Sequence, residues 1–223
     1  GKARRRSVII SREGRSVPRG SSRVVQIDNV VFDIGRVLVQ LEFSRFLRFL
    51  ADHGADTDSI ELMLERIDLT GYERGEFDGE ELLRRVAGLG RDGMPLDALR
   101  EQWLGMFVPE HSMIDLARRV AKTRRVYLLS NIGDLHWEFL DREIGVSGIG
   151  HGALPSFRAR ACKPDPAIYR QAEELFGLEP ARTVFIDDLM PNLDTARQRG
   201  WHVIHHLEPA TTFGDLRLLG VIE

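Results

Sequence analysis

The chain has 223 residues, of which 43% are hydrophobic and 29% are charged, and its formal net charge is −3. This composition is typical of a globular protein and excludes disorder along the whole chain. No apolar run approaches the roughly 20 residues that a membrane-spanning helix needs, so we predict no membrane partner. The single cysteine, Cys162, excludes an internal disulfide framework and favours a reducing, cytoplasmic compartment.

The charge is unevenly distributed along the chain. Residues 1–23 hold eight basic residues and one acidic residue, a net charge of +7, which leaves −10 for the remaining 200 residues. This first segment has neither helical nor strand periodicity, and its Ser, Gly and Pro content predicts a disordered basic tail. It holds no apolar stretch long enough for a secretory signal. Because nothing in the acidic remainder supports nucleic-acid binding, we expect no nucleic-acid partner.

Four short apolar runs predict strands that are buried on both faces of a parallel sheet. In chain order they are residues 30–32, 126–129, 183–186 and 201–204. Helical patterns alternate with them at about residues 109–122, 135–143, 166–176 and 192–199. Alternating strands and helices predict an α/β fold with a doubly wound parallel sheet.

Residues 41–108 differ from the rest because they show several amphipathic helical patterns and no convincing strand. This stretch is far longer than the roughly twelve residues that a crossover between parallel strands needs. We therefore predict a helical cap over residues 41–108, inserted into a core formed by residues 24–40 and 109–223. Trp103 and Phe107 lie four residues apart on one predicted helix face, which favours packing inside this cap.

Three of the predicted strands end in polar residues, and the carboxyl ends of strands are where open α/β sheets bind ligands. These residues are Asp33, Ser130 with Asn131, and Asp187 with Asp188. Each alone could be a turn or helix-capping residue. Three neighbouring carboxylates repel one another, so they take up protons or bind a cation, and oxygen ligands suit Mg²⁺. Lys163, one of only three lysines, would supply compensating positive charge.

Four segments together resemble the four motifs of the haloacid dehalogenase (HAD) superfamily. They are Asp33-Ile34-Gly35-Arg36-Val37-Leu38, Leu128-Leu129-Ser130-Asn131, Lys163-Pro164-Asp165-Pro166, and Phe185-Ile186-Asp187-Asp188 followed by Asn192. Their order and spacing agree with the superfamily over about residues 26–206, and the helical insertion lies where a type 1 cap belongs. Gly35, residues 130–136 and residues 72–77 further resemble the sugar-phosphate phosphatases of the α-glucose-1-phosphate type.

The resemblance implies a Mg²⁺-dependent phosphatase that acts on a small phosphorylated metabolite, a sugar phosphate, through an aspartyl-phosphate intermediate. Asp33 would be the nucleophile, and Lys163 would neutralise charge on it and on the transferring group. Mg²⁺ would be held by Asp33, the Gly35 carbonyl and Asp188, with Asp187 as a further ligand or as the partner of Lys163. Ser130 and the backbone N–H of Asn131 would hold phosphate oxygens.

Two positions depart from the family pattern. Gly35 stands where most phosphatases of the superfamily have a second Asp, which protonates the leaving group. His136 or Glu73 could take that role, although a His at the start of a helix is more often structural. Arg36 stands where relatives have a small residue suited to a tight turn, and its side chain could bind phosphate or point to solvent. Glu73 and Arg74 are also candidate substrate-binding residues of the cap.

Two other functions fit the same residues. In a haloacid dehalogenase the same Asp attacks carbon, but such an enzyme needs no metal, so the pair Asp187-Asp188 disfavours this alternative. A non-catalytic binding protein of the same fold is favoured only by Gly35 and Arg36 together. The sequence leaves open the substrate and whether the protein is a monomer or a homodimer.

Overall fold

The structure, a computed structural model, describes residues 26–91 and 93–223, so the predicted basic tail lies outside the described residues. Its core is a five-stranded sheet of order β5-β4-β1-β6-β7 with parallel neighbours. The strands are β1 (Asn29–Phe32), β4 (Arg125–Ser130), β5 (Gly152–Pro155), β6 (Thr183–Asp187) and β7 (His202–His205). Phe32 of the central strand β1 is in register with Leu128 of β4 and Ile186 of β6. Asp33 and Asp187 therefore follow at the same level of the sheet.

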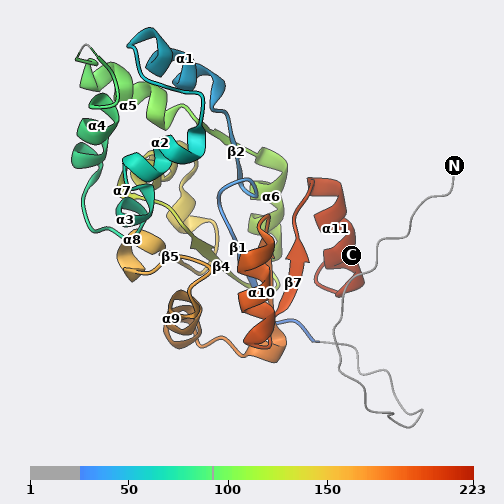
Figure 1. Ribbon diagram of the computed structural model, residues 1–223. Coiled ribbons are helices and arrows are strands. Elements are labelled where there is room, and N and C mark those ends of the chain that lie inside the picture. The colour runs from blue at the N-terminus through green and yellow to red at the C-terminus, as the bar shows by residue number, and fades with distance from the viewer. Residues whose placement is uncertain (1–25, 92) are drawn as a thin grey trace, which may run out of the picture.

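Helices cover both faces of this sheet (Figure 1). One face packs against α6 (His111–Val120), α7 (Asp134–Ile144) and α11 (Pro209–Leu218), and the other against α9 (Pro166–Phe176) and α10 (Met190–Gln198). Because strand side chains alternate, Val30 and Phe32 lie in the first apolar cluster and Val31 lies in the second. The short α8 (Ser156–Ala159) follows β5, and single 3₁₀ turns lie at Val146–Gly148 and Pro180–Arg182. The predicted doubly wound α/β fold is confirmed.

Five helices form a separate layer beyond the carboxyl ends of the strands (Figure 1). They are α1 (Ser44–Asp52), α2 (Ile60–Arg66), α3 (Leu69–Glu73), α4 (Gly79–Ala87) and α5 (Leu96–Leu104). Their apolar faces meet in their own buried cluster, which includes Phe46, Leu82 and Trp103. Polar side chains start several of them: Ser59 accepts a hydrogen bond from Leu62 N, and Asp78 accepts one from Glu81 N. We call these five helices the cap.

Three short strands and one helix differ from the sequence-based expectation. An antiparallel ribbon of β2 (Val39–Leu41) and β3 (Phe107–Pro109) joins the cap to the core, where no strand was expected within residues 41–108. The edge strand β5 and the helix α11 also add to the predicted elements. Strands of three or four residues are too short to show an alternating pattern, and they form here because partner strands satisfy their backbone groups.

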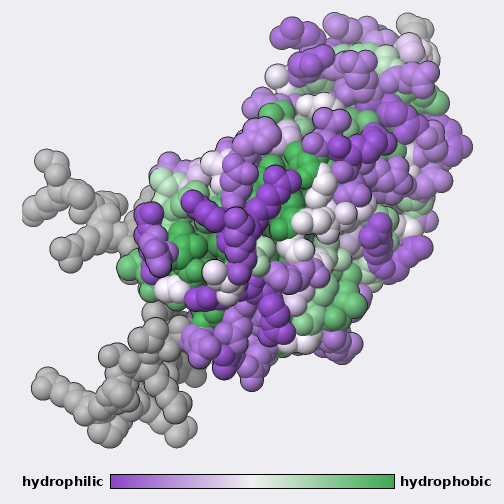
Figure 2. Space-filling model, turned by 180° about the vertical axis from the view of Figure 1, so that it is seen from behind, coloured by the Kyte–Doolittle hydropathy of each residue, from purple (hydrophilic) through white to green (hydrophobic). Residues whose placement is uncertain are grey.

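The molecular surface is largely hydrophilic on the face opposite to that of Figure 1, with hydrophobic side chains in separate patches (Figure 2). Along the described residues, we find no helix that combines the length and the hydropathy needed to cross a membrane.

The cap is fixed to the core at the start of α7. Tyr72 Oη donates to Asp134 Oδ1 at 2.8 Å and accepts from Leu135 N at 3.1 Å, and Gly79 N donates to Asp134 Oδ2 at 3.1 Å. The tyrosine ring lies so close to Gly133 that a Cβ there would come within 2.1 Å of it. A side chain at position 133 would therefore push the cap away from the core.

Replacing Tyr72 with Phe is expected to lower the free energy of unfolding by about 1–2 kcal/mol, because Asp134 loses a donor and Leu135 N loses an acceptor. Urea denaturation measures this loss. Tyr127→Phe removes the hydroxyl of a buried tyrosine in the sheet, away from the cap, and is the control. Equal effects of the two changes would show that the bonds to α7 do not hold the cap.

Candidate active site

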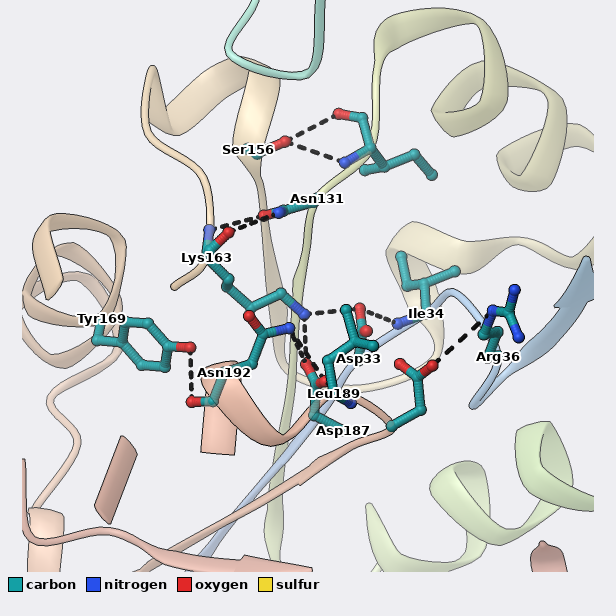
Figure 3. A network of polar contacts seen from close by, with 12 residues as sticks. Asp33, Ile34, Arg36, Asn131, Ser156, Lys163, Tyr169, Asp187, Leu189 and Asn192 are labelled. Atoms are coloured by element: carbon teal, nitrogen blue, oxygen red, sulfur yellow. Dashed lines mark hydrogen bonds and ion pairs between the residues drawn. The ribbon is translucent and has the colours of Figure 1, made fainter. Parts of the chain in front are cut away.

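Three carboxylates and a lysine meet at the carboxyl edge of the sheet (Figure 3). An oxygen of each of Asp33, Asp187 and Asp188 lies within 4.8 Å of the others. Lys163 Nζ lies 2.9 Å from Asp33 Oδ1 and 2.7 Å from Asp187 Oδ2. Asp33, Asp187 and Lys163 are buried, whereas Asp188 keeps some exposure. Three loops that are far apart in the sequence thus converge on one ammonium group.

Asp187 is held by donors on several sides. Asn192 Nδ2 donates to both of its carboxylate oxygens at 3.0 Å, and Leu189 N donates to Oδ1 at 2.8 Å. Asn192 is in turn fixed by Tyr169, whose hydroxyl donates to its carbonyl at 2.8 Å. Because its oxygens already carry these bonds and that of Lys163, Asp187 is better suited to position Lys163 than to bind a metal.

The carboxylates of Asp33 and Asp188 accept fewer hydrogen bonds than that of Asp187. Ile34 N donates to Asp33 Oδ1 at 2.7 Å, and the Lys163 bond ends on the same oxygen, so the two bonds fix the orientation of the carboxylate. The side chain of Asp188 is 16% exposed, and Arg36 Nε lies 3.9 Å from its Oδ2. These two carboxylates, on adjacent strands, are the groups through which a cation could be bound.

Burial sets the charges of this cluster. It raises the pKa of Asp33 and of Asp188, and the negative charge of Asp187 raises both further, against the opposing effect of Lys163. Burial alone would lower the pKa of Lys163, but the charges of Asp33 and Asp187 outweigh it and raise that pKa. One lysine faces three carboxylates, so a bound cation would favour the ionised form of each.

Ser130 and Asn131 end β4 beside this cluster. Asn131 Nδ2 donates to the Lys163 carbonyl at 2.9 Å, and Lys163 N donates to Asn131 Oδ1 at 2.8 Å. The side-chain amide of Asn131 therefore holds the backbone of Lys163 through its Oδ1 and one of the two N–H groups of Nδ2. The sequence predicts that the backbone N–H of Asn131, not its side chain, binds phosphate, and this stays a prediction. Phosphate binding by the buried Ser130 also stays a prediction.

The turn after β1 contains both departures from the family pattern, Gly35 and Arg36. Arg36 adopts a left-handed backbone conformation with φ 57°, which favours a small residue, and its side chain is 58% exposed beside Asp188. A Cβ built on Gly35 would meet no atom within 4 Å. A Cβ at position 35 therefore has room, so close packing does not require glycine there.

The structure separates the candidate residues of the cap. Glu73 lines a cavity together with Gly35 and Asn131. Arg74, by contrast, forms an ion pair with Glu76 in which both side chains are exposed, at 43% and 52%, with 2.8 Å between Nε and Oε1. Arg74 is not among the residues that line the cavity, so the expectation that it binds substrate has no support in the geometry.

His136 has a structural role. Its Nε2 lies 2.8 Å from the Trp103 carbonyl, and its ring stacks on Phe107 with 3.7 Å between the centroids. Burial lowers the pKa of His136 to about 4, although the bond to Trp103 opposes this change. A neutral imidazole held in this way is not a proton donor for a leaving group. Trp103 is buried in the cap cluster, as the sequence indicated, but Phe107 does not share its helix because α5 ends at Leu104 and Phe107 begins β3.

Ser156 was missed in the sequence, which holds no signal for it. Its hydroxyl donates to the Glu73 carbonyl at 2.6 Å and accepts from Ile132 N at 3.0 Å, so it joins the cap to the loop that follows β4. Figure 3 shows the side of this contact that lies in the core, the bonds of Ser156 to the backbone of Ile132 next to Asn131. Only the tertiary fold places Ser156, from the start of α8, between these two segments.

A doubly wound sheet whose central strand is followed by a buried Asp, with a Lys and two further acids beside it and a helical cap above, defines a capped hydrolase with a Rossmann-like core. Protein-family models give no match to this chain. The chain is 25% identical over 187 residues to D-ribitol-5-phosphate phosphatase of Bacteroides thetaiotaomicron, which covers 78% of this chain and 89% of that protein. It is 26% identical over 160 residues to sesquiterpene phosphatase astK of Aspergillus oryzae, which covers 66% of this chain and 76% of that one.

Solved structures agree with these relatives. A HAD family enzyme of Bacteroides thetaiotaomicron, in complex with magnesium and inorganic phosphate, matches with a TM-score of 0.72 and 25% identity over 80% of this chain and 93% of that one. A HAD-like hydrolase of Porphyromonas gingivalis matches with a TM-score of 0.69 and 25% identity, covering 80% and 90% of the two chains. The chain belongs to the HAD-like hydrolase superfamily.

Proposed function

We propose that this protein is a Mg²⁺-dependent phosphatase that hydrolyses a small phosphorylated metabolite through an aspartyl-phosphate on Asp33. The observation that carries the proposal is the cluster in which Lys163 bridges Asp33 and Asp187 while Asp188 stays accessible. Its donor set fits Mg²⁺, which prefers oxygen ligands and keeps open positions for water or phosphate. The relatives with phosphatase names, and the HAD enzyme with bound magnesium and phosphate, support the same activity.

Each residue of the site has a separate role in the proposed hydrolysis. The Asp33 carboxylate attacks phosphorus, the bond from phosphorus to the ester oxygen breaks, and that oxygen takes up a proton as the alcohol leaves. Water then attacks the phosphorus, and the bond to Asp33 breaks to release inorganic phosphate. Lys163 holds the attacking carboxylate in position, while Ser130 and the Asn131 N–H orient phosphate oxygens. Mg²⁺ held by Asp33, the Gly35 carbonyl and Asp188 would supply further positive charge at the phosphate.

Glu73 is the proposed source of the proton for the leaving group. It lines the cavity beside Gly35, whose position holds no acid in this chain. Burial raises the pKa of Glu73 to about 7, with Lys163 opposing and the charge of Asp33 adding to the rise. At or below this pH a substantial part of Glu73 is protonated and able to donate.

Replacing Glu73 with Gln is expected to lower kcat/KM roughly 100-fold, because the amide has no acidic proton. The parent protein loses activity as the pH rises through about 7, since Glu73 is then deprotonated, and the variant lacks this alkaline decline. The pH profile of kcat/KM measures both effects. Glu76→Gln, which changes the exposed partner of Arg74, is the matched control. An unchanged profile in the Glu73 variant would contradict the assignment.

Chelation separates the proposed activity from the two alternatives. We expect EDTA to reduce phosphate release to background and Mg²⁺ to restore it. Halide release from a 2-haloacid that survives EDTA would instead indicate a dehalogenase, in which Asp33 attacks carbon. Calorimetric binding of a phosphate ester without turnover, with Mg²⁺ present, would indicate a non-catalytic binding protein.

The residues at the phosphate do not decide which alcohol is esterified. The sequence favours a sugar phosphate, and the name of the ribitol-phosphate phosphatase supports that class. The name of the sesquiterpene phosphatase supports an apolar substrate instead. The residues between the cap and the core help to decide between a sugar phosphate and an apolar substrate.

A further inference from the structure

A cavity of about 140 Å³ lies between the cap and the core. Residues 41–107 form most of its wall, among them Phe46, Leu64 and Trp103 of the cap. The core contributes the rest, which is Gly35, Asn131, Ile132, Gly133 and His136. Its size is close to that of the engineered cavity of roughly 150 Å³ that holds one benzene ring. The cavity can therefore enclose a group of about six carbon atoms.

The cavity adjoins the carboxylate cluster. Gly35 lies two residues after Asp33, and Asn131 directly follows Ser130, so two of the loops that form the proposed phosphate site also line the cavity. A group esterified to a phosphate at Asp33 would have this space beside it. The lining of the cavity thus bears on the leaving group of the substrate.

Most polar groups of the lining are already engaged. The Tyr72 hydroxyl is bonded to Asp134 and Leu135 N, His136 Nε2 to the Trp103 carbonyl, and the Asn131 amide to the backbone of Lys163. Of the polar side chains that line the cavity, Glu73 and Trp103 take no part in these bonds, and His136 Nδ1 and the second N–H of Asn131 Nδ2 also lie outside them. Within residues 26–91 and 93–223, the buried Trp103 Nε1 has no hydrogen-bond partner.

Because few polar groups of the cavity lining are free to form hydrogen bonds, the cavity is poorly suited to a polyol. A buried hydroxyl that finds no partner weakens binding, because it gives up its bonds to water. A sugar chain would bring several hydroxyls against mostly aromatic and aliphatic side chains, with few polar groups to receive them. A hydrocarbon gains from burial against the same walls, and a single acceptor atom on it could pair with Trp103.

We propose, on the basis of the phosphatase function above, that the substrate is the phosphate monoester of an apolar alcohol whose hydrocarbon part fills this cavity. Hydrolysis consumes one water and yields the free alcohol and inorganic phosphate. The cavity, rather than hydrogen bonds to hydroxyls, then selects the substrate. The sugar phosphate expected from the sequence would be a poor substrate.

Two esters of equal chain length test this proposal. n-Hexyl phosphate and sorbitol 6-phosphate each join a six-carbon chain to the same phosphate group, and they differ in the hydroxyls. We expect kcat/KM to be at least tenfold higher for hexyl phosphate, since small apolar groups discriminate by roughly this factor or more. Hexyl phosphate should also exceed ethyl phosphate, while decyl phosphate should bring little further gain because the cavity is full. Equal or higher kcat/KM for sorbitol 6-phosphate would overturn the proposal.

Two leucines of α2 provide a matched pair of variants. Leu64 lines the cavity, whereas Leu62 is 60% exposed and lies outside it. We expect Leu64→Asn to lower kcat/KM for hexyl phosphate at least fivefold more than kcat/KM for acetyl phosphate, because the acyl group of acetyl phosphate is too small to fill the cavity. Leu62→Asn should change neither. Thermal unfolding of both variants reports on folding, and equal effects of the two changes on hexyl phosphate would contradict the proposal.

Binding separates a failure of this proposal from a failure of the phosphatase function. Hexylphosphonate and methylphosphonate resist hydrolysis, and calorimetry with Mg²⁺ compares their affinities. If no ester is hydrolysed but hexylphosphonate binds at least tenfold more tightly than methylphosphonate, the apolar site stands and the phosphatase function fails. If acetyl phosphate is hydrolysed but the two phosphonates bind equally, the phosphatase function stands and the apolar site is overturned.

Discussion

Replacing Asp33 with Asn is expected to lower kcat by about 10⁴-fold or more, because an uncharged amide cannot attack phosphorus and loss of a nucleophile removes the covalent route. Asn has the same shape as Asp, so the fold should be retained at this buried position. Phosphate release under saturating substrate measures the loss. Mass spectrometry of acid-quenched protein should detect a phosphate adduct on the peptide that contains Asp33 in the parent and none in the variant.

The control for this change is Asp194→Asn. Asp194 is an exposed residue of α10 that pairs with Arg197, and its loss should leave turnover unchanged. Turnover by the Asp33 variant within tenfold of the parent, or an adduct on another peptide, would contradict the assignment of the nucleophile.

Replacing Lys163 with Met is expected to lower the free energy of unfolding by about 3–5 kcal/mol, because it leaves two buried carboxylates without their cation. Burial and mutual repulsion then raise the pKa of Asp33 further. A carboxyl whose pKa is raised in the folded state binds its proton more tightly there, so the deficit should be largest at neutral pH and shrink as the pH falls. Urea denaturation in EDTA at several pH values measures both effects.

Two further variants sharpen this prediction. Lys122→Met changes an exposed lysine and should leave stability within about 0.5 kcal/mol of the parent. Adding Asp187→Asn to Lys163→Met removes one of the unpaired charges, so the double variant should be more stable than the sum of the two single changes predicts. Strict additivity would show that Lys163 and Asp187 are not coupled.

The edge of the sheet at which the acids meet could be predicted from short-range patterns. Apolar runs that end in Asp33, Ser130 and Asp187 indicate buried parallel strands, and parallel strands bring their carboxyl ends to one edge. Lys163 stood out because the chain has only three lysines. These predictions need only the local period of the chain and a general rule of sheet topology.

The use of each polar group could not be predicted in this way. Asp187 and Asp188 are neighbours in the sequence, yet Asn192 and Lys163 engage the first while the second stays accessible. The amide of Asn131 is taken up by the backbone of Lys163. These outcomes depend on side chains from other elements.

For Glu73 and Arg74 of the cap, too, the sequence could not predict which side chain faces the core. Adjacent residues at the end of a helix point in different directions, so one of them was bound to face away from the core. Which one does so is decided by Tyr72 and Ser156, which fix this segment against the loop that follows β4. Neither contact has a counterpart in the local sequence.

The α/β class and the convergence of three acids and one lysine follow from strand periodicity and chain order, which are properties of the sequence. Packing in three dimensions was needed to show that Glu73 lines the cavity, that Arg74 pairs with Glu76 at the surface, and that the space beside the acids is mostly apolar. Cavity linings join residues that are distant in the chain, and which groups are left unbonded there depends on every contact their neighbours make.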